Sequence, residues 1–204
     1  MRLVWALLSF LVLAVPALAQ TPATPDEDPD NVLIMQLKDG PVVIRMRPDL
    51  APNHVKRIKE LVRQGFYDGV VFHRVIPGSL AQTGDPKGTG EGGSGQKLKA
   101  EFSAEPHMRG TVSMARADDV DSADSQWFIC LKANPDFNRR YTVWGRVIRG
   151  MEFVNHIASG DEDSGHVVDP DHIISIRVEG DPPRPVAEPA AATISAKKAK
   201  AAAH

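Results

Sequence analysis

Short segments rich in β-branched and aromatic residues follow one another along the middle of this chain, and this pattern restricts the possible folds most strongly. Turn signals separate the segments, and Lys38-Asp39-Gly40 between the first two predicts a hairpin. Helical spacing of apolar residues appears only from about Pro52 and at 151–157. The pattern predicts a mainly β domain, a sandwich or a barrel, with strands at 32–37, 42–46, 70–76, 80–83, 111–115, 127–131, 142–148 and 173–178.

The predicted strand at 70–76 carries a permanent cation among apolar residues. Strand alternation places Arg74 on the same face as Phe72 and Ile76, and places His73 on the opposite face. A charge among apolar groups needs a partner or a ligand, although Arg74 alone could also lie along the sheet with its head in water. Arg74 is therefore a candidate site residue, and His73 is interpreted as structural.

The motif around Arg74 and three later motifs occur in the order found in one known family. They are FHRVIPG at 72–78 followed by Gln82 and GDP at 84–86, then GTVSMAR at 110–116, SQWFI at 125–129 and TVWGRV at 142–147. With these motifs the chain resembles the cyclophilin-type peptidyl-prolyl cis-trans isomerases from about Val32 to Val178. The resemblance implies a closed eight-stranded antiparallel β-barrel capped by two α-helices, acting on proline-containing polypeptides.

The resemblance also implies a role for each residue that matches the family's motifs. Arg74 would be the catalytic residue, because its fixed donors can reach the prolyl carbonyl and the imide nitrogen as the amide twists. Gln82 would hold the substrate backbone, and Ala115 and Arg116 would contact the residues before the proline. The proline pocket and its rim would be formed by Leu80, Met114, Phe128, Phe137 and Tyr141.

Several positions depart from the family's usual residues. Ser79 and Leu80 stand where many members have an aromatic residue and a methionine, and Thr83 replaces a usual glycine. Asp136 lies where strong binders of cyclosporin carry tryptophan, which predicts poor inhibitor sensitivity. The loss of an aromatic pocket wall at Ser79 keeps an alternative open, a proline-peptide-binding chaperone module with weak or no catalysis. The acidic loop 118–124 either favours basic substrates or is merely solvated.

Other functional classes find little support in the sequence. A net charge of −2 and a pI near 6.4 give no reason to expect nucleic acid as a partner. Gly88–Gly93 fits G-x-G-x-x-G, but no helix signal follows, so a dinucleotide site is not expected. The single cysteine, Cys130, excludes an internal disulfide and is interpreted as a buried thiol. The seven histidines lack zinc-site spacing, so neither a metal nor a cofactor is expected.

The two ends of the chain differ in composition from its middle. Residues 1–19 have the charged, apolar and small-residue regions of a secretory signal peptide, with a retained N-terminal anchor as the alternative. Residues 20–30 are interpreted as a disordered linker, 31–180 as the domain and 181–204 as a disordered Pro/Ala/Lys-rich tail that could touch anionic lipid. We expect a monomeric exported protein, in the periplasm, without a membrane span after cleavage. A structural envelope component that acts through its tails remains a further reading.

Overall fold

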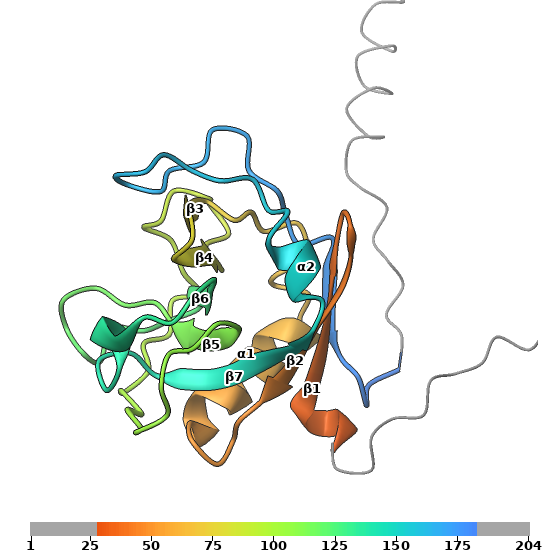
Figure 1. Ribbon diagram of the computed structural model, residues 1–204. Coiled ribbons are helices and arrows are strands. Elements are labelled where there is room, and N and C mark those ends of the chain that lie inside the picture. Colours follow the sequence, from red (N-terminus) through yellow and green to blue (C-terminus); the bar gives the residue numbers. More distant parts are fainter. Residues whose placement is uncertain (1–27, 183–204) are drawn as a thin grey trace, which may run out of the picture.

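A computed structural model describes residues 28–182, and it places eight antiparallel strands in one strongly curved sheet (Figure 1). The hydrogen-bonded order of the strands is β3-β4-β6-β5-β7-β2-β1-β8. The bounds of the strands are β1 Val32–Leu37, β2 Gly40–Met46, β3 Arg74–Ile76, β4 Leu80–Thr83, β5 Thr111–Met114, β6 Trp127–Cys130, β7 Val143–Arg149 and β8 Ser175–Val178. The prediction of a mainly β domain is confirmed.

The core lies on the concave side of this sheet. Alternate residues of β1, among them Leu33 and Met35, are fully buried, as the period of two in a strand requires. Trp127 of β6 and Trp144 of β7 meet edge to face with ring centroids 5.6 Å apart. Cys130 is buried, which confirms its interpretation, and burial raises the pKa of its thiol to about 11.

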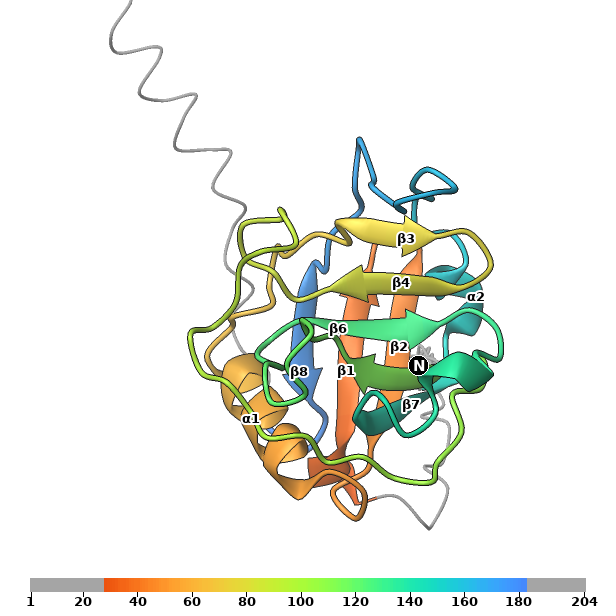
Figure 2. The ribbon, with the colours of Figure 1, turned by 90° about the vertical axis from the view of Figure 1, so that its left-hand side faces the viewer.

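Helix α1 (Pro52–Arg63) covers one open end of the curved sheet (Figure 2). Its apolar face is buried, with Val55 and Ile58 almost completely inaccessible. Ala51 cannot cap the helix with its side chain, and Glu101 takes over this role from a distant loop, since its carboxylate accepts the Asn53 and His54 amides at 3.1 and 3.0 Å. Proline at the first position and the glycine after the last turn are typical helix boundaries.

The expectation of a closed barrel is wrong, because β3 and β8 are the two edges of the sheet. Both strands are short, and each turns its free edge toward an irregular segment. Residues 69–75 bond instead to residues 160–173, for example from the Phe72 amide to the Asp171 carbonyl at 2.8 Å. These hydrogen bonds do not form a continuous ladder, and the β-pairing across this seam consists of isolated bridges, such as Val71 with His172. The sheet is therefore an open, eight-stranded half-barrel.

Several predicted boundaries shift in the structure. The second helix, α2, spans only Met151–Val154 rather than 151–157. The strand predicted at 70–76 is reduced to β3, so the alternation breaks before Arg74: Phe72 packs in the core, while Arg74 faces the outer surface. Gly40 belongs to β2 and not to the hairpin turn, and a Cβ there would overlap the ring of Phe153.

The first and last described residues are held together. Residues 28–30, which the sequence interpretation assigned to the linker, supply the cap and first residues of a short 3-10 helix, η1 (Pro29–Asn31). Arg63 of α1 binds Asp30 and Asp181 at 2.9 Å each. The predicted signal peptide and most of both tails lie outside the described residues. Within residues 28–182, no helix combines the length and apolarity needed to cross a bilayer.

Candidate active site

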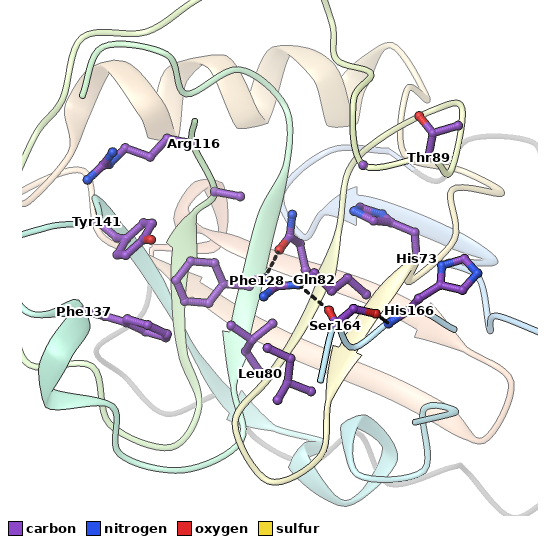
Figure 3. Close-up of a pocket in the computed structure, with 14 residues that line it drawn as sticks. His73, Leu80, Gln82, Thr89, Arg116, Phe128, Phe137, Tyr141, Ser164 and His166 are labelled. Atoms are coloured by element: carbon purple, nitrogen blue, oxygen red, sulfur yellow. Dashed lines mark hydrogen bonds between the residues drawn. The ribbon is translucent and has the colours of Figure 1, made fainter. Parts of the chain in front are cut away.

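A cavity of about 540 Å³ opens on the outer face of β3, β4 and β6 (Figure 3). One half of its wall is aromatic and aliphatic, and the other half is polar. It is lined by His73, Arg74, Ile76, Leu80, Gln82, Thr89, Gly90, Ala115, Arg116, Phe128, Phe137, Tyr141, Ser164 and His166.

The apolar half of the cavity is built around Phe128, which is 2% exposed. Strand β6 places Phe128 opposite Gln82 of β4, and the 3-10 helix η2 (Pro135–Phe137) brings Phe137 beside it. The rings of Phe128, Phe137 and Tyr141 meet edge to face, with centroids 5.2 to 5.6 Å apart. Leu80 packs against the same cluster. This arrangement suits a small apolar ring such as that of proline.

Arg74 lies where the apolar half meets the polar half. Its Nε donates to the Ser164 carbonyl at 3.0 Å, and one terminal nitrogen donates to Gln82 Oε1 at 3.1 Å. The pairing of β3 with β4 sets Arg74 directly opposite Gln82. Within residues 28–182, Arg74 forms no ion pair, so neutral groups hold the guanidinium and its charge is not cancelled. Three of its five N–H donors remain for a ligand.

Gln82 continues this hydrogen-bond chain away from Arg74. Its Nε2 donates to Gln126 Oε1 at 2.9 Å, and Gln126 Nε2 donates to the carbonyls of Gly90 and Gly92 at 2.8 Å each. The side-chain amide of Gln126 therefore has one orientation that satisfies every partner, with Oε1 toward Gln82 and Nε2 toward the two glycine carbonyls. Gln126 was not among the predicted site residues, although the motif at 125–129 contains it. The chain of contacts fixes which atoms Gln82 presents to the cavity.

The glycine-rich loop on the polar side is organised by the buried carboxylate of Asp85. This carboxylate accepts hydrogen bonds from the amides of Lys87, Thr89, Gly90 and Gly92 at 2.7 to 3.1 Å. Burial would raise the pKa of Asp85, but these donors outweigh it and lower the pKa to about 2. The loop amides therefore already have an internal anion, which explains the G-x-G-x-x-G match without a phosphate.

Arg116 forms the opposite rim of the cavity. Its guanidinium lies 5.1 Å from the centroid of the Tyr141 ring and donates to the carbonyls of Arg140, Ala117 and Asp118. The amide of Ala115 donates to the Gln126 carbonyl at 2.9 Å, so it is not available to a substrate. In the acidic loop, Asp119, Asp121 and Asp124 accept backbone amides, which engages most of its carboxylates in holding the loop.

Eight of the nine predicted site residues line the cavity, and Met114 does not. Met114 is 1% exposed and packs in the hydrophobic core. His73, expected to face away from Arg74, lines the same cavity because the strand pattern does not extend to it; burial lowers the pKa of its ring. The residues that sequence reasoning missed come mainly from loops without an apolar pattern: Thr89, Gly90, Ser164 and His166.

Ser79 directly precedes β4 and contributes no side chain to the cavity. Its hydroxyl lies 3.5 Å from Asn134 Oδ1, and the residue is not part of the cavity wall. Its carbonyl accepts the Leu131 amide at 2.8 Å, which fixes the turn before β4. Ile76 and Leu80 supply aliphatic wall instead.

Comparison with known proteins identifies the family. The family described as "Cyclophilin type peptidyl-prolyl cis-trans isomerase/CLD" matches residues 32–178. The chain is 47% identical over 186 residues to a probable peptidyl-prolyl cis-trans isomerase of Brucella suis biovar 1 (strain 1330), covering 85% of this chain and 93% of the relative. It is 42% identical over 128 residues to peptidyl-prolyl cis-trans isomerase B of Bacillus subtilis (strain 168), covering 61% and 89%.

Solved structures agree with this result. The crystal structure of cyclophilin AquaCyp293 from Hirschia baltica superposes with a TM-score of 0.69 at 28% identity and 77% coverage of both chains. A cyclophilin type peptidyl-prolyl cis-trans isomerase from Cryptosporidium parvum, crystallised in the presence of the dipeptide Ala-Pro, gives 0.67 at 26% identity, covering 74% of this chain and 99% of that one. The chain with the Arg74 cavity therefore belongs to the cyclophilin-type peptidyl-prolyl cis-trans isomerases.

Proposed function

We propose that the cavity around Arg74 binds an X-Pro segment and lowers the barrier to rotation of its peptide bond. The observation that carries this proposal is a guanidinium held by neutral acceptors at the edge of an aromatic pocket. Resonance makes the barrier about 18–20 kcal/mol, and the twisted amide loses that resonance. Its nitrogen then becomes a hydrogen-bond acceptor, which the planar ground state lacks.

The proline ring would enter the apolar half, between Phe128, Phe137 and Leu80. Arg74 would donate to the prolyl carbonyl or to the pyramidal nitrogen, and Gln82 would hold the flanking backbone. These contacts favour the twisted amide over the planar one, which is the condition for catalysis. An acceleration of five decades requires about 7 kcal/mol of such selective stabilisation. No covalent bond forms or breaks, and no proton needs to move.

The substrates would be proline-containing segments of exported proteins, handled by a monomer in the periplasm. This part of the proposal rests on the signal-like composition of residues 1–19. Cell fractionation with an antibody to the domain tests it, together with N-terminal sequencing of the mature protein. A mature chain that starts near Gln20 in the periplasmic fraction is the expected result, and an intact N-terminus in the membrane fraction would support the anchor alternative.

Exchange spectroscopy by NMR tests the catalytic proposal. The cis/trans exchange rate of a short Ala-Pro-Phe peptide is measured with the wild-type protein and with Arg74→Ala. We expect strong acceleration by the wild type and its near loss in the variant, while the variant keeps its fold. Acceleration that is unchanged in Arg74→Ala would remove Arg74 from the mechanism.

A second candidate function, a proline-binding chaperone module, is favoured by one observation. Ser79 contributes nothing to the cavity wall, so the pocket has less apolar surface than one with an aromatic residue there. Peptide binding detected by chemical-shift changes, without faster exchange across several X-Pro peptides, would support this function over catalysis.

A further inference from the structure

The loop of residues 160–166 lies along β3 and contacts the side chain of Arg74. Ser164 gives its carbonyl to Arg74 Nε at 3.0 Å, and Ser164 and His166 both line the cavity (Figure 3). The backbones are also paired: the Val75 amide donates to the Gly165 carbonyl at 2.7 Å, and the Gly160 amide donates to the Val75 carbonyl at 2.9 Å. This loop therefore contacts both the side chain of Arg74 and its strand.

The shape of this loop depends on the carboxylate of Asp161. One oxygen accepts the amides of Asp163 at 3.1 Å and Ser164 at 2.6 Å. The other accepts the Ser164 hydroxyl at 2.6 Å and the His166 amide at 3.2 Å. Residues 160–166 contain no large apolar side chain that could hold the loop by packing. The carboxylate therefore replaces a hydrophobic anchor.

The backbone carbonyl of Asp161 adds to this by holding the peptide group that meets Arg74. The amide of Gly165, which shares this peptide group with the Ser164 carbonyl, donates to the Asp161 backbone carbonyl at 3.0 Å. Gly165 has a left-handed φ of 76°, and a Cβ there would lie 2.7 Å from Ile76 Cγ1 and 3.2 Å from Arg74 Cγ. Little room is left for the loop to shift along β3. The Ser164 carbonyl thus has one defined direction.

We propose that Asp161 is a positioning residue for isomerisation: it shapes the loop so that the Ser164 carbonyl holds Arg74 Nε and aims the guanidinium into the cavity. The inference rests on the proposed role of Arg74. A carbonyl orients the arginine and leaves its charge intact, whereas a carboxylate in the same place would neutralise it. Asp161 does not contact Arg74 itself and acts on it through the neutral backbone of Ser164.

The test compares Asp161→Ala with the control Glu162→Ala in the same loop. Glu162 is exposed and makes no hydrogen bond or ion pair among residues 28–182. We expect Asp161→Ala to lower kcat for an Ala-Pro peptide roughly tenfold with little change in KM, because misplacing a catalytic group weakens the transition state more than the bound ground state. Asp161→Asn keeps one acceptor oxygen, so its kcat should lie between those of the wild type and Asp161→Ala. Glu162→Ala should match the wild type.

A double-mutant cycle separates positioning from a general structural effect. If Asp161 acts through Arg74, Asp161→Ala should cause no further loss in the Arg74→Ala background. An equal tenfold loss in both backgrounds would overturn the proposal. If Asp161→Ala does not fold, Asp161→Asn is measured in the same cycle. Full activity of Asp161→Asn, together with an unchanged NMR signal of the Arg74 Nε–H group, would also count against the proposal.

The Arg74 Nε–H signal in a ¹⁵N NMR spectrum reads the contact without any substrate. We expect a distinct, slowly exchanging signal in the wild type and in Glu162→Ala, and faster hydrogen exchange in Asp161→Ala. An unchanged signal in Asp161→Ala would overturn the inference. If the wild type does not accelerate peptide exchange at all, the proposed function fails, whereas this signal still decides whether Asp161 positions Arg74.

Discussion

A Cβ atom on Gly92 would overlap the carboxylate of Asp85, so the loop amide and the carboxylate meet at a distance that only glycine permits. The Gly92 amide donates to Asp85 Oδ2 at 3.1 Å. A Cβ atom on Gly93 would likewise lie 2.8 Å from the carboxylate of Asp124, which accepts the amides of Ser94 and Gly95. The glycines of this loop therefore serve internal carboxylates.

Gly92→Ala should destabilise the domain by about 2–3 kcal/mol, because the added methyl must displace a buried carboxylate or the loop backbone. Gly180→Ala is a matched control, since a Cβ there has no neighbour closer than 3.4 Å. Urea unfolding followed by tryptophan fluorescence measures both. Equal free energies of unfolding for Gly92→Ala and the wild type would show that the loop accommodates the methyl easily.

The Asp85 carboxylate should make the free energy of unfolding depend on pH in the acidic range. Its pKa falls from 3.8 to about 2 on folding, so the folded protein binds this proton more weakly than the unfolded chain. The stability it contributes is full above about pH 4 and is lost as the pH falls toward 2. We expect the difference in unfolding free energy between wild type and Asp85→Asn to shrink over this range, as measured by urea unfolding at a series of pH values. A constant difference would contradict the lowered pKa.

Two buried histidines should add a second pH dependence at higher pH. Burial lowers the pKa values of His73 and His107 below 6.5, so below that pH the unfolded chain takes up protons that the folded protein does not. Stability should therefore decrease as the pH falls below about 6.5. NMR titration of both rings should give midpoints under 6.5. A His107→Gln variant should lose part of the slope of unfolding free energy against pH, and an unchanged slope would exclude His107 as its source.

Ser79→Phe should tighten the binding of proline peptides about fivefold by adding apolar surface beside Leu80. The Ser79 hydroxyl has only a 3.5 Å contact to Asn134, so its removal should cost little. Ser79→Ala is the control, because it removes the hydroxyl without adding a ring. Titration of a peptide by NMR gives both dissociation constants. Equal affinity in Phe and Ala variants would indicate that the new ring turns away from the cavity.

Segments whose pattern is local could be predicted from the sequence. The strands at 32–37 and 80–83 match β1 and β4, since each alternates or buries its apolar residues between clear turn signals. The strand at 70–76 could not be predicted correctly, because Phe72 faces the core through an irregular backbone that bonds across the seam. Whether the sheet closes into a barrel or stays open depends on such long-range pairing, which the periodicity of the sequence does not encode.

The candidate site divides in the same way. Arg74 and Phe128 lie on strands within motifs that resemble a known family, and both line the cavity. Ser164 and His166 enter it from a loop whose shape depends on Asp161, and nothing in the local pattern connects that loop to β3. The resemblance predicts Met114 in the pocket, whereas its side chain is buried in the core.

The pairing of β1 with β8 determines how the domain would respond to force. The two strands are antiparallel, Leu33 lies opposite Val178, and the Gly180 amide bonds to the Pro29 carbonyl at 3.1 Å. A pull between residues 28 and 182 would first load the Arg63 clamp on Asp30 and Asp181, and would then peel β8 from β1 one bond at a time. Unzipping of this kind resists tension far less than shearing, so the domain would yield from its edge strand while β3, β4 and β6 remained paired.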